Sequence, residues 1–238
     1  MNRILFESFE ISGGTAGFGG DRARHVVEIL HGETGQVLKT GQIDGAVGTS
    51  VIESIEERPD GYFITARVDH NDQAPSPWAD LILAPPRPRV MKRLLPQLAS
   101  LGVGRIFLVG AKKVEKDFWG ATLLKEEIYR PLLIEGLMQA GTSAMPTLEV
   151  RRNFRKFLNE ELEDRFANVR RRVVAHPYGA AASSVGAEGR LLLAVGPEGG
   201  WTDEEVSLLE QHDFTRYSLG SRILRTDTAL IALLARLG

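Results

Sequence analysis

The stretch 191-LLLAVGPEGGWTDEE-205 contains an apolar run, a glycine-rich turn and the start of a helix. Leu191–Val195 is short, apolar and bounded by a turn signal, which is typical of a buried strand. Thr202 and Glu205 have the T-x-x-E spacing of a helix capping box. A strand that leads into a helix through a tight turn is a building unit of α/β sheets, so this stretch predicts an α/β fold.

The turn itself is a candidate ligand site. In α/β sheets, ligands bind at the carboxyl ends of the strands. Gly196, Gly199 and Gly200 lie at such an end, where the absence of side chains lets a ligand approach the backbone closely. The spacing is not GxGxxG, and the turn lacks the lysine of a phosphate-binding P-loop, which disfavours a nucleoside triphosphate. The alternative is a tight turn without a ligand.

From residue 79 onward, strand and helix patterns alternate. The strand candidates are Ala79–Ala84, Arg105–Val109, Leu148–Arg151, Arg172–Ala175, Leu191–Val195 and Thr215–Leu219. The helix candidates are Arg89–Leu101, Thr122–Gln139, Phe154–Asp164, Asp203–His212 and Asp227–Leu237. Pro88 suits the first turn of one helix, and Pro131 predicts a kink in another. The alternation predicts a mostly parallel sheet covered by helices.

The first 70 residues have a different pattern, with several short strands and one helix. The strand candidates are Arg3–Phe6, Gln36–Thr40, Ala46–Ile55 and Tyr62–Val68, with a Pro-Asp-Gly turn at 58–61. Asp21 is the expected cap of the helix, and Gly32 its expected end. The polar segment 70-HNDQAPSPW-78 reads as a linker. We therefore expect a small barrel over residues 1–72 and an α/β domain over 73–238.

Composition excludes several protein classes. The 238 residues are 43% hydrophobic and 25% charged, as in an ordinary globular protein. No apolar run approaches the roughly 18–20 residues of a membrane span, and the N-terminus lacks a secretory pattern, so we expect a cytoplasmic protein without a membrane partner. The absence of cysteine excludes disulfides, thiolate metal sites and a cysteine nucleophile, and the five histidines lack metal-site spacing, which predicts no metal.

Charge is distributed unevenly along the chain. Residues 1–75 carry 6 Lys/Arg and 12 Asp/Glu, although the whole chain is close to neutral at −2. The basic clusters lie further on, at Arg87, Arg89, Lys92 and Arg93; Lys112, Lys113 and Lys116; Arg151, Arg152, Arg155 and Lys156; and Arg170, Arg171 and Arg172. Such clusters suit contacts with phosphates, or else form solvated faces.

A second loop, 219-LGSRILRTDTA-229, again joins a strand to a helix. Arg222 and Arg225 lie among apolar residues at the helix start, where they can bind an anion or a carbonyl oxygen, or pair with Asp227 or Glu198. The helix that follows is apolar on nearly all faces, which requires burial in a subunit interface or in the core of its own domain.

The motifs GPEGGWTDEE and LGSRILRTDTA, in this order, resemble the small-subunit ribosomal RNA methyltransferase E family of the SPOUT superfamily. Weaker matches are Arg24–Leu30, the segment from Ala84 to Val103, and Gln139 followed by Pro146. The resemblance implies a PUA-like β-barrel, used for RNA contact, followed by a SPOUT α/β-knot domain with a deep trefoil knot. It also implies a homodimer that uses S-adenosylmethionine (SAM) to methylate N3 of a uridine in 16S rRNA of the small ribosomal subunit.

The resemblance also assigns residues. As uridine N3 loses its proton, charge spreads onto O2 and O4, so we expect Arg225, with Arg222 second, to stabilise it. Glu198, followed by Asp227, is the expected base. The expected SAM contacts are His176, Ala194, Val195, Gly196, Glu198, Gly199, Gly200, Leu219, Gly220, Ile223, Leu224, Arg225, Thr226 and Ala229. The expected substrate contacts are Arg24, His25, Lys92, Arg93, Gln139 and Arg222.

Four positions depart from the family pattern, at His31, Ser100, Thr142 and Asp227. The first three lie outside the cofactor loops, so they bear on RNA recognition. The alternatives are therefore a SPOUT methyltransferase with a different RNA or base, and a non-catalytic RNA-binding relative. The second alternative predicts decayed cofactor loops, whereas both loops are intact. A dinucleotide-dependent oxidoreductase fits poorly because its glycine fingerprint is absent.

Overall fold

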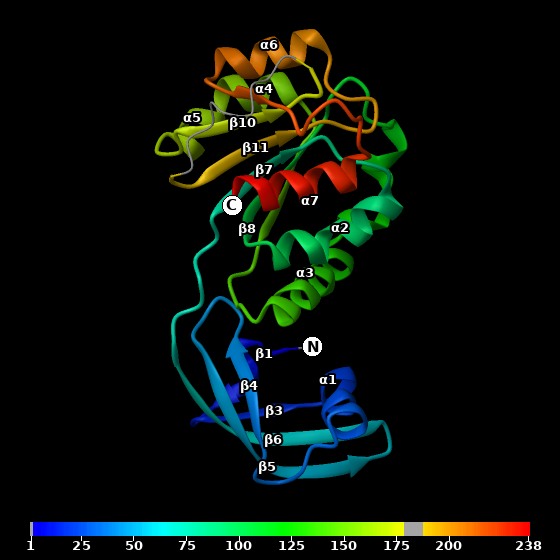
Figure 1. Cartoon of the computed structure of the whole chain (residues 1–238). Helices are drawn as coiled ribbons and strands as arrows, with labels where there is room; N and C mark the ends of the chain where they lie inside the picture. The colour runs from blue at the N-terminus through cyan, green and yellow to red at the C-terminus, as the bar shows by residue number, and fades with distance from the viewer. Residues whose placement is uncertain (1, 179–187) are drawn as a thin grey trace. The chain divides into compact units, whose positions relative to one another are not determined.

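The computed structural model describes residues 2–178 and 188–238, which divide into two compact units (Figure 1). Unit 1 comprises Met1–Ser76 and Ile134–Met145, and unit 2 comprises Pro77–Leu133 and Pro146–Gly238. One of the three points at which the chain passes between the units falls within a helix, α3 (Glu126–Ala140).

Unit 1 is built on a curled six-stranded sheet with the order β1-β4-β5-β6-β3-β2 (Figure 1). Its strands are β1 (Ile4–Phe6), β2 (Ile11–Ser12), β3 (Thr15–Phe18), β4 (Val37–Gln42), β5 (Val47–Arg58) and β6 (Gly61–Asp72). All pairings are antiparallel except β1 with β4. Phe6, Phe18, Ile52 and Ile64 are fully buried against one another in its core.

The predicted turn at 58–61 joins β5 to β6, and Gly61 adopts a φ of +129° there. The pattern missed β2 and β3 because they are short and rich in small residues. It also ended the last strand too early, since β6 continues to Asp72 and only residues 73–78 lie between the strands of the two units. The closed barrel stays a prediction.

The helix of unit 1 differs from the prediction at both ends. It consists of α1 (Gly20–Arg24) and a π-helical turn over His25–Ile29. Gly19 is the N-cap, and Asp21 lies inside the first turn without capping it, so the expected cap was wrong. The helix ends before Gly32 because His31 takes up a left-handed φ of +49°.

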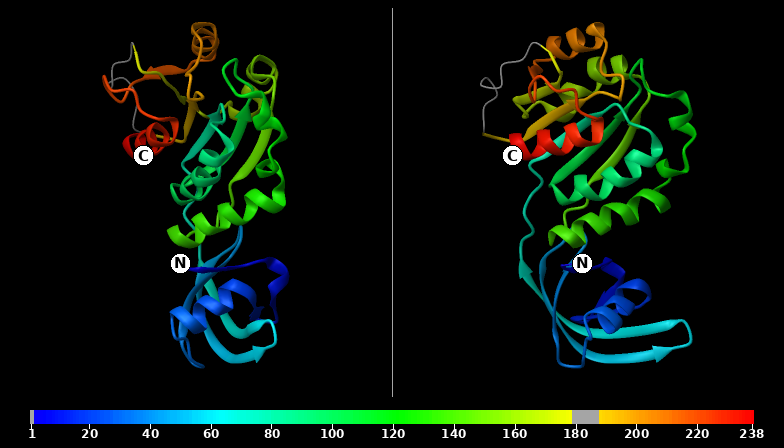
Figure 2. Two further views of the ribbon diagram at one scale, coloured as in Figure 1. Left: turned by 90° about the vertical axis from the view of Figure 1, so that its right-hand side faces the viewer. Right: turned by 45° about the vertical axis from the view of Figure 1, so that its right-hand side comes forward.

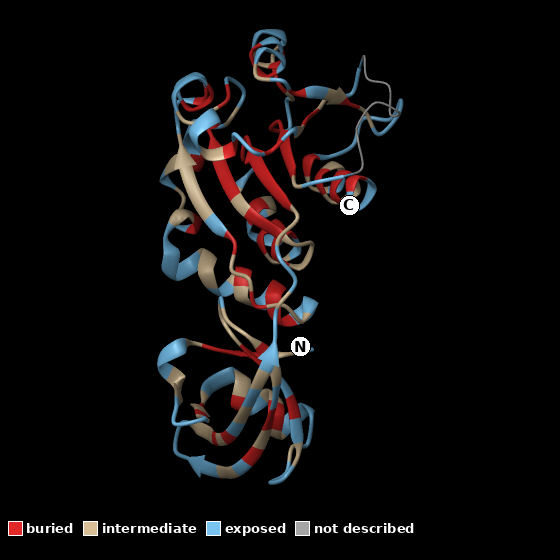
Figure 3. Ribbon diagram, turned by 90° about the vertical axis from the view of Figure 1, so that its left-hand side faces the viewer, coloured by how far each residue is buried: buried red, intermediate tan, exposed pale blue. Residues whose placement is uncertain are grey.

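Unit 2 contains a six-stranded sheet with the order β12-β10-β11-β7-β8-β9, in which every pairing is parallel. Its strands are β7 (Ala79–Leu83), β8 (Val103–Val109), β9 (Thr147–Arg151), β10 (Arg171–Ala175), β11 (Leu191–Val195) and β12 (Thr215–Tyr217). The central strands β7 and β11 are buried at every position, as Figure 3 shows, because helices cover both faces. The predicted parallel α/β sheet is confirmed.

The helices of unit 2 are α2 (Pro88–Ser100), the first part of α3, α4 (Phe154–Glu160), α5 (Leu162–Phe166), α6 (Asp203–Gln211) and α7 (Thr226–Leu237). Pro88 occupies the first turn of α2, as predicted. The expected helix 154–164 is wrong as one piece, because two helices, α4 and α5, meet at Glu161, which has a φ of −116°. The expected helix 122–139 begins later, at Glu126, after 3-10 turns at Lys116–Gly120 and Thr122–Leu124.

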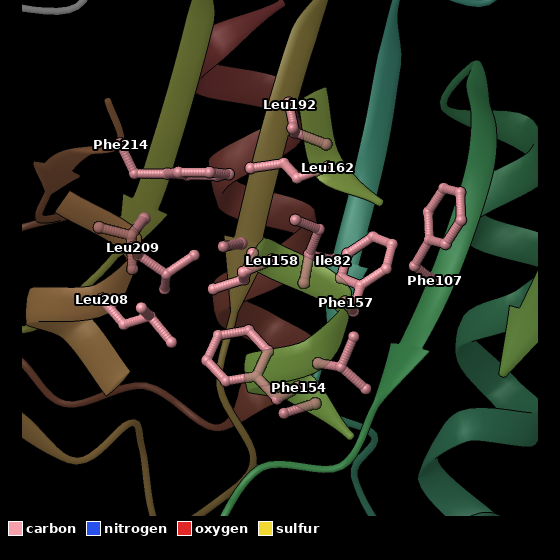
Figure 4. Close-up of a cluster of buried hydrophobic side chains, with 14 of the residues drawn as sticks. Ile82, Phe107, Phe154, Phe157, Leu158, Leu162, Leu192, Leu208, Leu209 and Phe214 are labelled. Carbon is pink, nitrogen blue, oxygen red and sulfur yellow. The ribbon is translucent and has the colours of Figure 1, made fainter. Parts of the chain in front are cut away.

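One face of the sheet packs against α4, α5 and α6 through a cluster of aromatic and aliphatic side chains (Figure 4). Phe107 on β8 stacks on Phe157 of α4 with ring centroids 5.1 Å apart. Helix α7 packs against α2 and β11 (Figures 1 and 2). The C-terminal helix is therefore held against the first helix of its unit.

A buried ion-pair network ties three strands together near their amino ends. Asp80 on β7 is fully buried and accepts two hydrogen bonds of 2.7 Å from Arg190, which directly precedes β11. Arg105 on β8 donates a third, also of 2.7 Å. Burial acts to raise the pKa of Asp80, but the hydrogen bonds from Arg190 and Arg105 outweigh it and hold the pKa below its usual value.

Candidate active site

A cavity of about 470 Å³ lies at the carboxyl ends of β10, β11 and β12, which are neighbours in the sheet. It is lined by Ala175 and Val195 from two strand ends, and by the loops that follow each of the three strands. Because the strands are parallel, their loops converge on one edge, as expected for a ligand site in this fold class.

The loop after β11 is held in shape by its glycines. A Cβ on Gly196 would lie 2.9 Å from the backbone nitrogen of Trp201, and Gly200 adopts a φ of +67°. Neither position accepts a larger residue without strain. Thr202 and Glu205 then cap α6, since each side chain accepts a hydrogen bond from the other's backbone amide. The predicted capping box is confirmed.

Two contacts hold this loop from outside. Glu198 Oε1 accepts a hydrogen bond of 3.1 Å from the backbone amide of Arg87, at the start of α2. Lys113 Nζ, from the loop after β8, donates to the carbonyl oxygen of Gly199 at 2.8 Å. The guanidinium of Arg87 in turn pairs with Glu115 at 2.9 Å, and this contact raises the pKa of Arg87. Segments far apart in sequence thus position the glycine loop.

The other two loops are tied to each other. The amide of His176, directly after β10, donates to the carbonyl of Tyr217 at 3.0 Å. The Ser218 hydroxyl donates to the carbonyl of Pro177 at 3.2 Å and accepts from the amide of Gly220 at 3.1 Å. These bonds fix the wall of the cavity that faces the glycine loop.

Arg222 and Arg225 have different environments. Arg222 lines the cavity, and its side chain has no ion pair within residues 2–178 and 188–238. Arg225 does not line it: its side chain is 73% exposed and its Nε lies 3.6 Å from Asp227 Oδ1. The same carboxylate lies 3.4 Å from Arg93 Nη2 of α2. Pairing with Asp227, one of the predicted alternatives, thus applies to Arg225.

The structure brings most of the predicted SAM contacts together around this cavity. Those that line it are His176, Val195, Gly196, Glu198, Gly199, Gly200, Leu219, Gly220, Ile223, Leu224, Thr226 and Ala229. Ala194 does not, because it is buried inside the sheet, and Arg225 does not, because it turns toward Asp227.

The predicted substrate residues are divided between the two units. Arg24 and His25 are in the helix of unit 1, where Arg24 pairs with Asp21 at 3.2 Å and His25 Nε2 is buried without a hydrogen-bond partner among the described atoms. Gln139, also in unit 1, accepts a hydrogen bond from Asn2 at its carbonyl. Lys92 and Arg93 are on α2 in unit 2, with Lys92 exposed.

Sequence reasoning missed several residues that line the cavity, among them Lys113, Trp201 and Tyr217. Lys113 belongs to a basic cluster directly after a strand, and this position could have identified it as a residue of the site. Trp201 is 6% exposed, stacks on Phe154 with centroids 5.0 Å apart, and has a buried Nε1 without a partner in the described part of the chain. Tyr217 ends β12 and is buried.

Comparison with known proteins places this arrangement in a family. Residues 73–238 match the family described as an RNA methyltransferase domain. The chain is 30% identical to ribosomal RNA small subunit methyltransferase E of Treponema pallidum, over 98% of this chain and 88% of that protein. This chain belongs to the small-subunit ribosomal RNA methyltransferase E family. The predicted resemblance is confirmed at that level.

Another sequence relative supports the assignment to the methyltransferase E family, and two solved structures share the fold. Methyltransferase E 1 of Borreliella burgdorferi is 28% identical over 61% of this chain and 60% of its own length. A suspected methyltransferase from Legionella pneumophila, solved with bound SAM, aligns with a TM-score of 0.78 at 25% identity, over 99% of this chain and 96% of that one. The enzyme from Neisseria gonorrhoeae, bound to SAM, shares the fold with a TM-score of 0.76 at 22% identity, over 99% and 95%.

The described residues contain no candidate membrane-spanning helix and no candidate metal cluster. None of the helices there is both long and apolar enough to cross a membrane. Among residues 2–178 and 188–238, no cluster of three or more His, Asp or Glu side chains is arranged to hold a metal ion.

Proposed function

We propose that this protein is a SAM-dependent methyltransferase that modifies N3 of one uridine in 16S rRNA of the small ribosomal subunit, in the cytoplasm. The observation that carries the proposal is the cavity between the Gly196–Gly200 and Leu219–Ala229 loops, in a chain whose relatives are small-subunit rRNA methyltransferases. The Legionella and Neisseria structures contain SAM.

The residues around the cavity fit SAM. Its volume of about 470 Å³ lies in the range of small-molecule sites, roughly 300–1,000 Å³. Leu219, Leu224 and Leu233 give it an apolar wall for an adenine ring, and the glycine loop presents backbone groups for the polar edges. Trp201 adds a buried N–H without a partner in the described structure.

SAM supplies a methyl group that is already activated, so the protein's task is to align the nucleophile and to stabilise its charge. Uridine N3 becomes nucleophilic when its proton leaves and negative charge spreads onto O2 and O4. A positioned donor there is worth roughly 2.7–4 kcal/mol. Arg222, which lines the cavity without an acidic partner in the described part, is better placed for this role than Arg225, which faces Asp227.

Glu198 is better explained as a positioning residue than as the base. One of its carboxylate oxygens accepts from the amide of Arg87, so the side chain holds the glycine loop against the start of α2. Asp227, the second candidate base, is engaged by Arg93, Arg225 and the amide of Thr228. Both predicted bases thus have structural partners in this conformation.

We also propose that the protein acts as a homodimer and that its C-terminal segment forms the deep knot of the SPOUT fold. The loop before α7 exposes Ile223 by 76% and Leu224 by 38%, and these residues lie beside the cavity. Exposed apolar side chains at one site are typical of an interface. A second copy would bury them next to the ligand.

The deciding experiment is reverse transcription of small-subunit rRNA from the host and from a strain lacking the gene. Methylation at N3 blocks the Watson–Crick edge, so one stop at a uridine should be present in the host and absent from the deletion strain. Purified protein and SAM should restore the stop on subunits from the deletion strain. Stops that are identical in both strains would refute the N3-uridine proposal.

One observation favours a second candidate, a methyltransferase of the same fold with a different RNA target. Of the chain's 31 Asp and Glu, 13 are in unit 1, against only 6 of its 29 Lys and Arg. An acidic unit is a poor surface for phosphates. In that case purified protein would bind SAM in calorimetry while the rRNA stop stayed unchanged.

A further inference from the structure

A second cavity, of about 350 Å³, lies in unit 2 beside the proposed SAM site and has no role in the chemistry described above. It is formed where the loop after β8, the start of α4 and the start of α6 meet. Three cationic residues line it: Lys112, Arg152 and Arg155. We propose that this cavity is a subsite for a backbone phosphate of the RNA substrate, next to the nucleotide whose base enters the first cavity.

The two cavities share a wall. Lys113 lines the first cavity and Lys112 lines the second; Trp201 lines the first and Thr202 the second. The boundary between them is therefore the loop after β8 on one side and the turn into α6 on the other. A polynucleotide with one base in the first cavity would continue directly past the second.

The cations in the second cavity are available for a ligand. In the part of the chain that the structure describes, the side chains of Lys112 and Arg155 have no ion pair or hydrogen bond, and both are exposed. The guanidinium of Arg152 is oriented by Trp119: it donates to the Trp119 carbonyl at 3.2 Å and lies 5.8 Å from the centre of the indole ring. Arginine and lysine in such a cluster are typical phosphate contacts.

The acidic residues at the cavity do not cancel this charge. Glu205 has both carboxylate oxygens engaged, Oε2 by the amide of Thr202 at 2.8 Å and Oε1 by the amide of Lys112 at 2.7 Å. Glu204 is the other acidic residue of the lining, so three cations face two carboxylates and the lining keeps a net positive charge.

The cavity is also a rigid structure. The amide of Gly110 donates to the carbonyl of Arg151 at 3.1 Å, and a Cβ on Gly110 would lie 1.9 Å from the carbonyl oxygen of Arg152. This close approach requires glycine and locks the loop after β8 against the segment after β9. Asn153 caps α4 by accepting from the amide of Lys156 at 2.9 Å. The cationic side chains therefore extend from a fixed frame.

The proposal rests on RNA being the substrate, and the salt dependence of RNA binding tests it. The probe is a fluorescein-labelled, single-stranded oligouridylate, measured by anisotropy with the full-length protein over a series of salt concentrations. Each phosphate contact adds about 0.7 to the slope of log K against log salt for single strands. Lys112→Gln and Arg155→Gln should each lower the slope by about that amount and weaken binding severalfold at low salt.

Lys156→Gln is the matched control. Lys156 follows Arg155 on α4, but it lies 3.8 Å from Glu160 and does not line the cavity. Its substitution should leave the slope unchanged. Slopes of Lys112→Gln and Arg155→Gln equal to the wild-type slope would overturn the proposal. So would calorimetric binding of inorganic phosphate that these variants abolish without any change in RNA binding, because the cavity would then hold a free anion.

SAM binding by calorimetry separates this proposal from the proposed function. The three variants should bind SAM with wild-type affinity, since none of the substituted residues lines the first cavity. A wild-type protein that fails to bind SAM would refute the methyltransferase proposal, whereas the slope comparison would still decide the subsite.

Discussion

The carboxylate of Glu198 accepts a hydrogen bond of 3.1 Å from the backbone amide of Arg87, across 111 residues of sequence. A glutamine side chain has a carbonyl oxygen that can accept the same bond but cannot act as a base. If Glu198 positions the loop, Glu198→Gln should keep methyl transfer within about tenfold of wild type, because a hydrogen bond to a charged group is worth about 1.5–3 kcal/mol and is only partly lost. A general base would instead contribute about 10²–10⁴-fold.

Glu198→Ala completes the comparison. It removes the acceptor and frees the glycine loop, so we expect a weaker SAM affinity in calorimetry than for Glu198→Gln. A loss of more than about 10²-fold in kcat for Glu198→Gln, with unchanged SAM affinity, would restore the base assignment.

Substitution of Arg222 and of Arg225 should have different effects on the rate of methyl transfer. We expect Arg222→Gln to lower methyl transfer by about 10²–10³-fold, the usual cost of one donor to a developing oxyanion, with little change in SAM affinity. Arg225→Gln should have a smaller effect, because its side chain is exposed and faces Asp227. Single-turnover rates with saturating SAM and small subunits from the deletion strain measure both. A larger loss for Arg225→Gln would mean that this loop rearranges when RNA binds.

The α/β sheet and the loops at 196–200 and 219–229 could be predicted from sequence because they depend on local patterns. Leu191–Val195 is buried at every position, and Thr202 with Glu205 forms the expected cap. The hydrogen bonds that hold the glycine loop could not be predicted. The bond between Glu198 and Arg87 joins residues 111 positions apart, and the bond between Lys113 and Gly199 joins residues 86 positions apart. Sequence spacing shows which residues share a loop. It does not show which distant backbone group a side chain meets.

The prediction of a single helix over 154–164 was wrong for a related reason. Its apolar pattern is continuous, but the structure has two helices that meet at Glu161, whose side chain accepts one hydrogen bond from Arg151 and lies 3.3 Å from Arg165. The spacing of apolar residues does not show where such a break between two helices falls.

Among the ion-paired residues described above, Asp80 should be the one whose substitution lowers the free energy of unfolding most. Asp80→Asn leaves Arg190 and Arg105 without their carboxylate, and breaking a buried pair in this way typically costs about 3–5 kcal/mol. Urea unfolding at neutral pH measures the loss. Glu210→Gln is the control: it removes an exposed pair with Arg216, for which about 0–1 kcal/mol is expected.

The lowered pKa of Asp80 predicts that the stability of the fold depends on pH. The pKa of Asp80 is lower in the folded protein than its usual value of about 3.9, so the folded state binds fewer protons there than the unfolded chain. The contribution of Asp80 to the free energy of unfolding is fully present above about pH 4–5. It is lost as the pH falls through the lowered pKa of Asp80 in the folded state. Wild type should therefore lose more stability than Asp80→Asn between pH 5 and pH 3, as unfolding midpoints would show; equal losses would contradict the assignment.

The exposed apolar loop before α7 predicts self-association. Ile223→Glu places a charge on the side chain that is 76% exposed, so a dimer buried at this loop should dissociate. Sedimentation equilibrium measures the state of wild type and variant. Phe9→Glu, on the 83% exposed Phe9 of unit 1, is the control and should leave the mass unchanged. A monomeric wild-type protein at micromolar concentration would contradict the homodimer.

The glycine loop should tolerate no side chain at two of its positions. Gly196→Ala would place a Cβ 2.9 Å from the backbone nitrogen of Trp201, and Gly200→Ala would force a φ of +67° on a residue with a side chain. A non-glycine residue in that region costs about 1–2 kcal/mol, so the loop should shift and SAM affinity should fall about tenfold or more. Gly120→Ala is the matched control, because nothing lies within 4 Å of its Cβ position and its φ is not positive. Calorimetric SAM affinities close to wild type for Gly196→Ala and Gly200→Ala would show that this loop does not form the wall of the cofactor site.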